Sequence, residues 1–309
     1  MKVADCHCDL LSYLAGDLTR DVNDPESKSS LMQLKDGGVH TQVFPIYTAT
    51  GPESLKEGAL QFSLYSKLYA HIETGIAGPL TPYLGIENAS SFCDEKEPLE
   101  FALKRLSAWH QKHPLAYISF TWNEENRFGG GVYTDSGLKP DGLKLLEWMC
   151  EQNIPIDLSH ASDQLAMDIL REVRGYPYRV IASHSNFREV HPHVRNISDQ
   201  IAEGIMDQQG IIGLNLITHF VNPHSLFTFI DHIHHAKKLG VDRALCLGAD
   251  FFAEIDVAKT REHLKPFFFE GFQTAACYPK LRELLESYFN APFIDQMLYM
   301  TLTHFLRNP

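Results

Sequence analysis

The sequence lacks any stretch of about 18 uncharged apolar residues, the length that a membrane-spanning helix requires. Its N-terminus also lacks the basic region and the following apolar stretch of a secretory leader. These absences predict a cytoplasmic protein with no membrane partner. The six cysteines are then expected to stay reduced.

Positive charge is scarce as well. The chain has 27 lysines and arginines against 39 aspartates and glutamates, a formal net charge of -12. A surface with that excess of negative charge repels phosphate backbones, so nucleic acid is not an expected partner. The glycine run 129–131 lacks the GK[ST] ending of a phosphate-binding loop, and we interpret it as a loop at the mouth of the fold.

No linker, low-complexity tract or internal repeat divides the 309 residues, so we expect one domain spanning residues 1–309. Short apolar runs alternate with longer segments of helical period, which is typical of strand–helix units around a parallel sheet. The pattern predicts an α/β fold, a single (β/α)8 TIM-type barrel. The predicted strands span residues 3–7, 41–47, 83–87, 116–122, 155–159, 180–184, 211–216 and 244–250, and the predicted helices include 54–72, 99–112, 138–153, 164–174, 198–208 and 226–239.

Acids, histidines and one tryptophan lie at or just after the ends of different predicted strands. The carboxyl ends of barrel strands meet at one face, so these side chains are expected to form one site. Neutral imidazoles combined with carboxylates favour zinc, and a glutamate can bridge two ions about 3.5–4 Å apart. The residues are His7, Glu87, Trp122, His160, His184 and Asp250, with Asp9 two positions after His7.

Two cysteines flank His7, so a cysteine-rich metal site is an alternative at this point. Cys6 and Cys8 are expected to point to the opposite face from Asp5, His7 and Asp9, because successive side chains alternate in a strand. Free cysteine is also among the residues most often buried. We therefore predict that both cysteines pack in the core.

Seven short motifs, in order and at compatible spacings, resemble the membrane dipeptidases of the renal type, peptidase family M19 of the amidohydrolase superfamily. The resemblance runs from Val3 to about Asp250. The motifs are DCHCD at 5–9, GGV with QVF at 37–44, GIEN at 85–88, TWN at 121–123 with Asn126, DLSH at 157–160, SHSN at 183–186 with Arg195, Asn196 and Asp199, and LGADF at 247–251.

The resemblance implies a binuclear site with two zinc ions. It assigns His7 and Asp9 to one zinc and His160 and His184 to the other, with Glu87 bridging both. Asp250 matches the acid that shuttles the proton of the nucleophilic water, and Arg195 matches the arginine that holds the terminal carboxylate of the substrate. The resemblance thus predicts a zinc dipeptidase in which a metal-bridging hydroxide attacks dipeptides with a free C-terminal carboxylate, including those ending in a D-residue. It also suggests a homodimer.

Other roles for these residues remain open. Asp250 is also suited to cap a following helix, and Arg195 to form a surface salt bridge with Asp199. Asn123, Asn126 and Asn186 are expected to organise loops through hydrogen bonds to the backbone. The histidines of the 226–239 helix, His232, His234 and His235, are expected to face solvent.

The sequence departs from the family around the substrate rather than at the metals. Trp122 replaces a substrate-binding histidine of animal members, and an indole can donate one hydrogen bond but cannot act as an acid or base. Phe252 and Ala253 replace the usual second acid and glycine, so we expect a more apolar pocket wall. Asn215 is expected to contact substrate, although Leu216 and Ile217 follow it where an aromatic residue is common.

Two alternative functions therefore stay open. One is another amidohydrolase activity, such as hydrolysis of an N-acyl amino acid or a lactam, which would use the same metals. The other is a non-catalytic barrel that binds metal. Retention of Asp250 beside all five predicted ligands argues against the second alternative.

Overall fold

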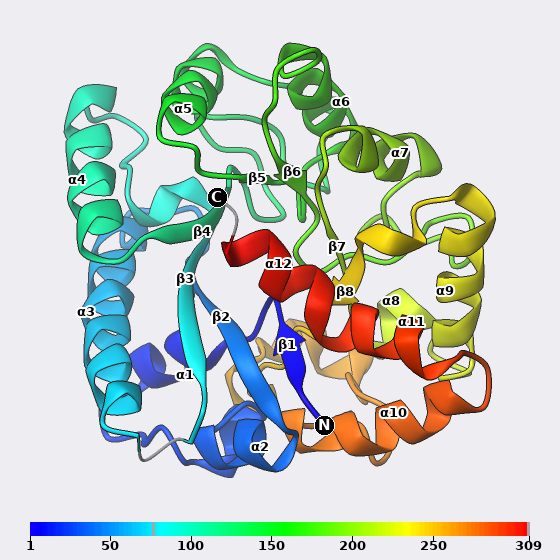
Figure 1. Ribbon diagram of the computed structural model, residues 1–309. Helices are drawn as coiled ribbons and strands as arrows, with labels where there is room; N and C mark the ends of the chain where they lie inside the picture. The colour runs from blue at the N-terminus through cyan, green and yellow to red at the C-terminus, as the bar shows by residue number, and fades with distance from the viewer. Residues whose placement is uncertain (76–77, 308–309) are drawn as a thin grey trace.

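The computed structural model describes residues 1–75 and 78–307 and contains a barrel of eight parallel strands enclosed by helices (Figure 1). The strands pair in the order β6-β5-β4-β3-β2-β1-β8-β7, and a bridge between Ala182 and Ile212 joins the two outer strands. The predicted TIM-type barrel is confirmed. Its strands are β1 (Val3–Asp5), β2 (Val39–Tyr47), β3 (Thr81–Glu87), β4 (Leu115–Ser119), β5 (Ile156–Asp157), β6 (Val180–Ile181), β7 (Ile212–Leu214) and β8 (Leu245–Leu247).

The six helices predicted from periodicity correspond to α3 (Ser54–Glu73), α4 (Leu99–Lys112), α5 (Pro140–Glu151), α6 (Asp163–Glu172), α7 (Asp199–Asp207) and α9 (Thr228–Leu239). The remaining helices, which the sequence did not predict, have 4 to 9 residues. They are α1 (Leu10–Gly16), α2 (Leu31–Asp36), α8 (Thr218–Val221), α10 (Tyr278–Glu286), α11 (Ala291–Asp295) and α12 (Thr301–Arg307).

Apolar side chains fill both faces of the strands, as expected for a parallel sheet. The larger cluster combines strand residues such as Ile86 of β3 with helix residues such as Leu106 of α4. A smaller cluster of residues from alternate strand positions includes Cys6, Tyr117 and Cys246, and Phe305 of α12 packs onto it. Figure 1 shows α12 lying across one end of the barrel, so this end is closed by α12 and the opposite end is left for the site.

Six of the eight strands are shorter than predicted, whereas β2 and β3 begin two residues earlier, and the shorter β1 corrects one step of the sequence argument. β1 ends at Asp5, so strand alternation does not extend to His7 and Asp9. The Asp5 side chain instead accepts a hydrogen bond from Tyr278 of α10. The packing prediction itself is confirmed, because Cys6 and Cys8 are both free, fully buried and part of the apolar clusters.

The histidines of α9 do not all face solvent. His232 is fully buried, and its Nδ1 accepts a hydrogen bond from the Phe187 backbone at 3.2 Å while its Nε2 lies 3.2 Å from the Val221 carbonyl. His232 is on the same helix face as Ile233 and Ala236, which turns it toward the barrel. The prediction of an exposed position was therefore wrong for His232 and correct for His234. None of the helices in the described ranges is long and apolar enough to cross a membrane.

Candidate metal and active site

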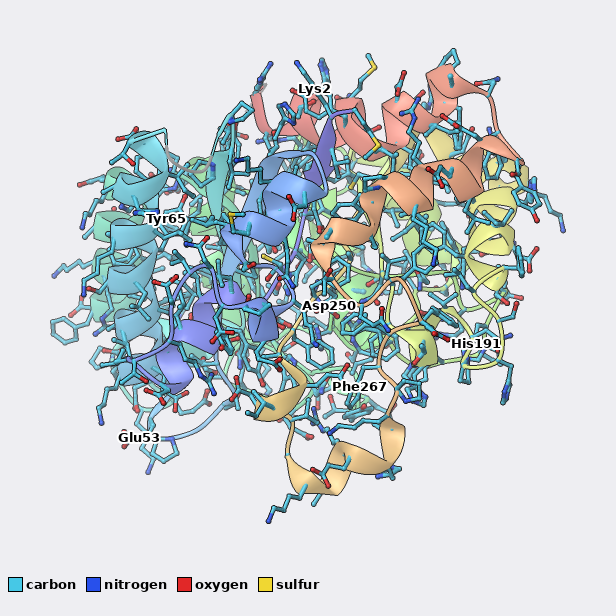
Figure 2. All side chains as sticks on the ribbon, turned by 90° about the horizontal axis from the view of Figure 1, so that it is seen from below. Lys2, Glu53, Tyr65, His191, Asp250 and Phe267 are labelled. Carbon is cyan, nitrogen blue, oxygen red and sulfur yellow. The ribbon has the colours of Figure 1, made fainter. Side chains whose placement is uncertain are left out.

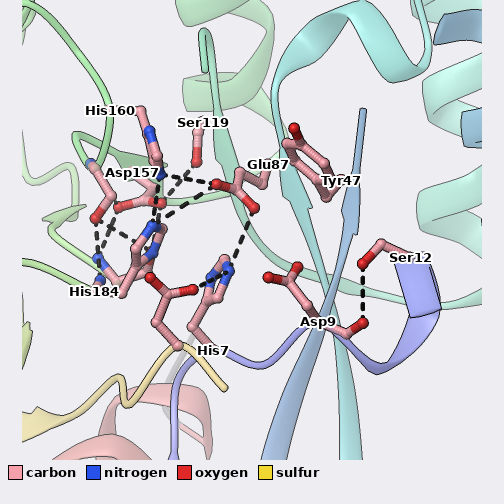
Figure 3. Close-up of polar contacts among 12 residues, drawn as sticks. His7, Asp9, Ser12, Tyr47, Glu87, Ser119, Asp157, His160 and His184 are labelled. Atoms are coloured by element: carbon pink, nitrogen blue, oxygen red, sulfur yellow. Dashed lines mark hydrogen bonds and ion pairs between the residues drawn. The ribbon is translucent and has the colours of Figure 1, made fainter. Parts of the chain in front are cut away.

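The Glu87 carboxylate lies at the centre of the predicted ligand set, at the end of β3 (Figure 3). Its Oε2 is 3.3 Å from Nε2 of His7, which follows β1. Its Oε1 is 2.9 Å from Nε2 of His160, after β5, and 3.7 Å from Nε2 of His184, after β6. The barrel thus brings three histidines from separate strand ends around one carboxylate.

A second group forms around His7, Asp9 and Asp250. One ligand atom of each lies within 4.8 Å of the others, and the same holds for His7, Glu87 and His184. His7 Nε2 is 3.8 Å from Oδ1 of Asp250. His7 Nε2 and Asp9 Oδ1 are both buried without a hydrogen-bond partner, which is costly unless a cation binds there.

Each histidine of the cluster is oriented through its other ring nitrogen. Nδ1 of His7 lies 3.0 Å from the Tyr117 hydroxyl, Nδ1 of His160 lies 2.7 Å from the Asn123 amide oxygen, and Nδ1 of His184 lies 2.7 Å from the Ser183 hydroxyl. All three Nε2 atoms therefore face the cluster, as in protein metal sites, where an outer hydrogen bond fixes the ring. Asn123 supports a ligand directly, whereas only a loop-organising role had been predicted.

The electrostatics of the site also favour a cation. Burial raises the pKa of Asp9, and the charge of Glu87 raises it further. Burial lowers the pKa of His7, but the charges of Glu87, Asp250 and Asp9 outweigh burial and raise it to about 10. Burial and the nearby Arg195 lower the pKa of His160 to about 3. The carboxylates around His7 thus favour a positive charge at this position, and carboxylates beside imidazoles are the donor set of a divalent metal site.

Two buried carboxylates that the sequence reasoning missed hold the loops on which the ligands lie. Asp5 accepts hydrogen bonds from the backbone nitrogens of His7 and Ala249, which ties the end of β1 to the end of β8. Asp157 accepts from the backbone and hydroxyl of Ser183 and from Ser119, which ties β5 to β6 and β4. The sequence contains one sign of this role, because Asp5 lies two residues before His7 and Asp157 lies three residues before His160.

His160 and Asp250 share an unusual backbone conformation. Their φ angles are 67° and 63°, in the left-handed region that non-glycine residues rarely adopt. Such positions cost free energy and persist where the surrounding structure imposes them, often at functional sites. Both side chains are thereby turned toward the cluster rather than along the chain.

Arg195 lies beside the cluster and is only 4% exposed. Its Nη2 is 3.4 Å from the His184 carbonyl, and its Nε is buried without a partner. Among residues 1–75 and 78–307, no carboxylate forms an ion pair with it. The alternative salt bridge with Asp199 is wrong, because Asp199 lies 2.7 Å from Nε2 of His235. The helix-cap alternative for Asp250 is wrong too, since the next helical turn is capped at Ala253.

Asn215 lies behind Asp250. It is fully buried, its amide nitrogen donates to Oδ2 of Asp250 at 2.9 Å, and its amide oxygen accepts from the Ile217 backbone at 2.6 Å. Asn186 in turn bonds to the Asn215 backbone. The substrate contact predicted for Asn215 stays a prediction, and the hydrogen bond shows in addition that Asn215 orients Asp250.

We expect Asn215→Leu to lower kcat by about tenfold, because one charge-assisted hydrogen bond is worth about 1.5–3 kcal/mol. KM should change little, since the amide is behind the carboxylate. Steady-state kinetics on a dipeptide would measure the effects on kcat and KM separately. A variant that raised KM and kept kcat would instead support the predicted contact of Asn215 with substrate.

Aromatic rings lie beside His160 and just after Asp250. The Trp122 ring lies 6.0 Å from the His160 ring and meets Tyr47 edge-on at 5.2 Å between centroids. Phe252 packs edge-on against Phe267 at 5.2 Å and also contacts Phe268. Phe252 thus belongs to an aromatic cluster two residues after Asp250, and its place in the pocket wall stays a prediction.

Comparison with known proteins agrees with this geometry. Residues 59–290 match the family described as membrane dipeptidase, peptidase family M19. A protein of the pqqA 5' region from Klebsiella pneumoniae is 28% identical over 145 residues, covering 42% of this chain and 52% of the relative. Dipeptidase tcpJ of Claviceps purpurea is 27% identical over 203 residues, covering 62% and 44%. The matches thus span about half the length of these curated relatives.

Solved structures show the same fold. A metallopeptidase from Rhodobacter sphaeroides, liganded with a phosphinate mimic of L-Ala-D-Ala, superposes with a TM-score of 0.80 at 19% identity over 99% of both chains. The probable dipeptidase PvdM of Pseudomonas aeruginosa superposes with a TM-score of 0.76 at 13% identity, over 99% of this chain and 94% of the other.

Proposed function

The chain belongs to the membrane dipeptidase family, peptidase family M19, and on that premise we propose that it is a zinc-dependent dipeptidase. The proposed substrates are dipeptides with a free C-terminal carboxylate, including those ending in a D-residue. The observation that carries the proposal is the Glu87 carboxylate, which faces His7 through one oxygen and His160 and His184 through the other.

The proposed metal ligands fit a pair of ions. His7 and Asp9 would hold one ion, His160 and His184 the second, and Glu87 would contact both. The unpartnered atoms His7 Nε2 and Asp9 Oδ1 support this assignment. When bound, two divalent ions lower the pKa of a water molecule and polarise the substrate carbonyl.

The remaining residues bind the substrate and move a proton. Arg195 grips the C-terminal carboxylate, because a guanidinium offers two parallel donors to one carboxylate. Oδ2 of Asp250 is held by Asn215, which leaves Oδ1, the atom facing His7, to accept a proton. As the water oxygen adds to the carbonyl carbon, its proton passes to Asp250. Asp250 then donates that proton to the departing amine as the C–N bond breaks.

A substrate panel tests the proposal. The zinc-loaded protein is expected to hydrolyse L-Ala-L-Ala and L-Ala-D-Ala, and to leave N-acetyl-alanine nearly untouched. Faster turnover of N-acyl amino acids or lactams would overturn the dipeptidase assignment in favour of another amidohydrolase activity. Absence of turnover on every member of the panel would favour a non-catalytic barrel.

Metal removal is expected to abolish the activity and to loosen the fold. We expect about two zinc ions per chain, and chelation should lower the melting temperature by about 5–10 °C, because bound ions stabilise the native state and unbound carboxylates repel one another. Elemental analysis and thermal unfolding, before and after zinc is restored, measure both effects. A protein that stayed active after complete chelation would contradict the proposal.

A further inference from the structure

A second arginine lies at the mouth of the barrel, on the segment 254–266. Figure 2 shows this segment, which leads into Phe267, at the end of the barrel opposite α12. Asp256 anchors its first part through two hydrogen bonds of 2.7 Å from Arg20. The Leu264 carbonyl, 2.6 Å from Nε2 of His219, anchors its last part. Between the anchors, the 3-10 helix η5 (Lys259–Leu264) carries Arg261 over the site.

The Arg261 guanidinium stacks on Trp122, with its carbon 4.9 Å from the centroid of the ring. Burial raises the pKa of Tyr47, as do the charges of Glu87 and Asp9, whereas the charge of Arg261 acts in the opposite direction. Arg261 therefore lies beside two aromatic residues that contact each other, Trp122 and Tyr47. Within the described part of the chain, no carboxylate forms an ion pair with it.

The two arginines lie next to different members of the histidine pair. Arg195 contacts the His184 carbonyl, whereas the Trp122 ring beneath Arg261 neighbours His160. Nε2 of His160 and Nε2 of His184 are only 2.9 Å apart. A dipeptide with its C-terminal carboxylate at Arg195 and its scissile amide at the cluster thus extends its acyl residue toward Trp122 and Arg261.

Building on the proposed peptidase function, we propose that Arg261 and Trp122 form a subsite for a carboxylate on the acyl residue of the substrate. A guanidinium over an indole ring still has N–H donors that can bind a carboxylate. The enzyme then prefers dipeptides with an acidic N-terminal residue. The carboxylate can belong to the side chain of an α-linked glutamyl residue or to the main chain of a γ-linked one.

The test compares kcat/KM for Glu-Ala and its uncharged isostere Gln-Ala with the zinc-loaded protein. We expect wild-type protein to favour Glu-Ala by about fivefold or more, the range of a well-oriented, partly exposed ion pair. Arg261→Gln should reduce this ratio to near one. Lys259→Gln removes the same charge from the same 3-10 helix without contact to Trp122, so it should keep the wild-type ratio.

Further arms separate the sources of the carboxylate. A second pair of substrates tests the γ-linked form. It compares γ-Glu-Ala with the same peptide in which the α-carboxylate of the glutamyl residue is replaced by an amide. A preference in either pair that Arg261→Gln removes supports the subsite. A ratio near one in both pairs with wild-type protein overturns it, as does a preference that survives Arg261→Gln or is lost equally in Lys259→Gln.

The proposed function and the subsite fail in different ways. Turnover of Ala-Ala reports the peptidase activity and does not involve the acyl carboxylate. If the protein hydrolyses no dipeptide, calorimetric binding of Glu-Ala and Gln-Ala to the zinc-loaded protein still decides the subsite. Tighter binding of Glu-Ala that Arg261→Gln removes supports the subsite, and equal binding of the two peptides overturns it.

Discussion

Asp250→Asn is expected to lower kcat by about 10²- to 10⁴-fold while the protein keeps its metal. Asp250 presents Oδ1 toward His7 at 3.8 Å, whereas Asn215 holds Oδ2 at 2.9 Å. An amide in the same position can still accept the Asn215 hydrogen bond, but it cannot carry a proton between water and amine. Asparagine also tolerates the left-handed backbone at this position, where φ is 63°.

Three measurements make this substitution interpretable. Zinc content and melting temperature should match those of the wild-type protein, and steady-state kinetics should show the loss in kcat rather than in KM. Asp242→Asn serves as the matched control, because Asp242 pairs with Lys237 on the surface, 3.3 Å away. Near-normal turnover in Asp250→Asn would remove Asp250 from the proposed proton path.

The sequence predicts the barrel and the cluster because both depend on local patterns. Each short apolar run indicates a strand, and the parallel barrel then brings the strand ends together without further information. His7, Glu87, His160 and His184 could therefore be assigned to one site from their positions alone. The prediction of the barrel, which is confirmed, depends on the order of the strands and not on the contacts of single side chains.

The contacts that orient the ligands could not be predicted in the same way. Asp5 accepts a hydrogen bond from Tyr278, which is 273 residues later in the chain. Asp157 of β5 accepts one from Ser183, which follows the neighbouring strand β6. Such partners depend on side-chain directions beyond the strand ends, where alternation no longer applies. His232 illustrates the same limit, because helical periodicity gives no reason to bury an imidazole until Phe187 and Val221 supply its partners.

Asp5 and Asp157 have the same structural role at two places in the barrel. Burial raises the pKa of each carboxyl, and several hydrogen bonds oppose that increase. Each carboxylate joins the ends of neighbouring strands just before a histidine ligand. The loops that carry the predicted ligands are thus fixed by groups that lie outside the cluster.

Arg195→Met is expected to lower kcat/KM for dipeptides by about 10²-fold or more, because a desolvated charge pair with the substrate carboxylate is lost. The same substitution should raise the melting temperature of the zinc-loaded protein by about 2–4 °C. Burial lowers the pKa of Arg195, although the charges of Asp250 and Glu87 oppose this, and its Nε has no partner. The buried positive charge of Arg195 therefore stabilises the enzyme–substrate complex and destabilises the protein without substrate.

Arg195→Lys separates charge from geometry. A lysine keeps the positive charge but loses the two parallel donors, so its kcat/KM should fall between those of the wild-type protein and Arg195→Met. Kinetics on L-Ala-D-Ala and its C-terminal amide, with thermal unfolding of all three proteins, measure the effects. If Arg195 binds the carboxylate, the wild-type preference for the free acid over the amide disappears in Arg195→Met. An unchanged preference would mean that another group binds the C-terminus, and a lower melting temperature would mean that the Arg195 charge is already compensated within the protein.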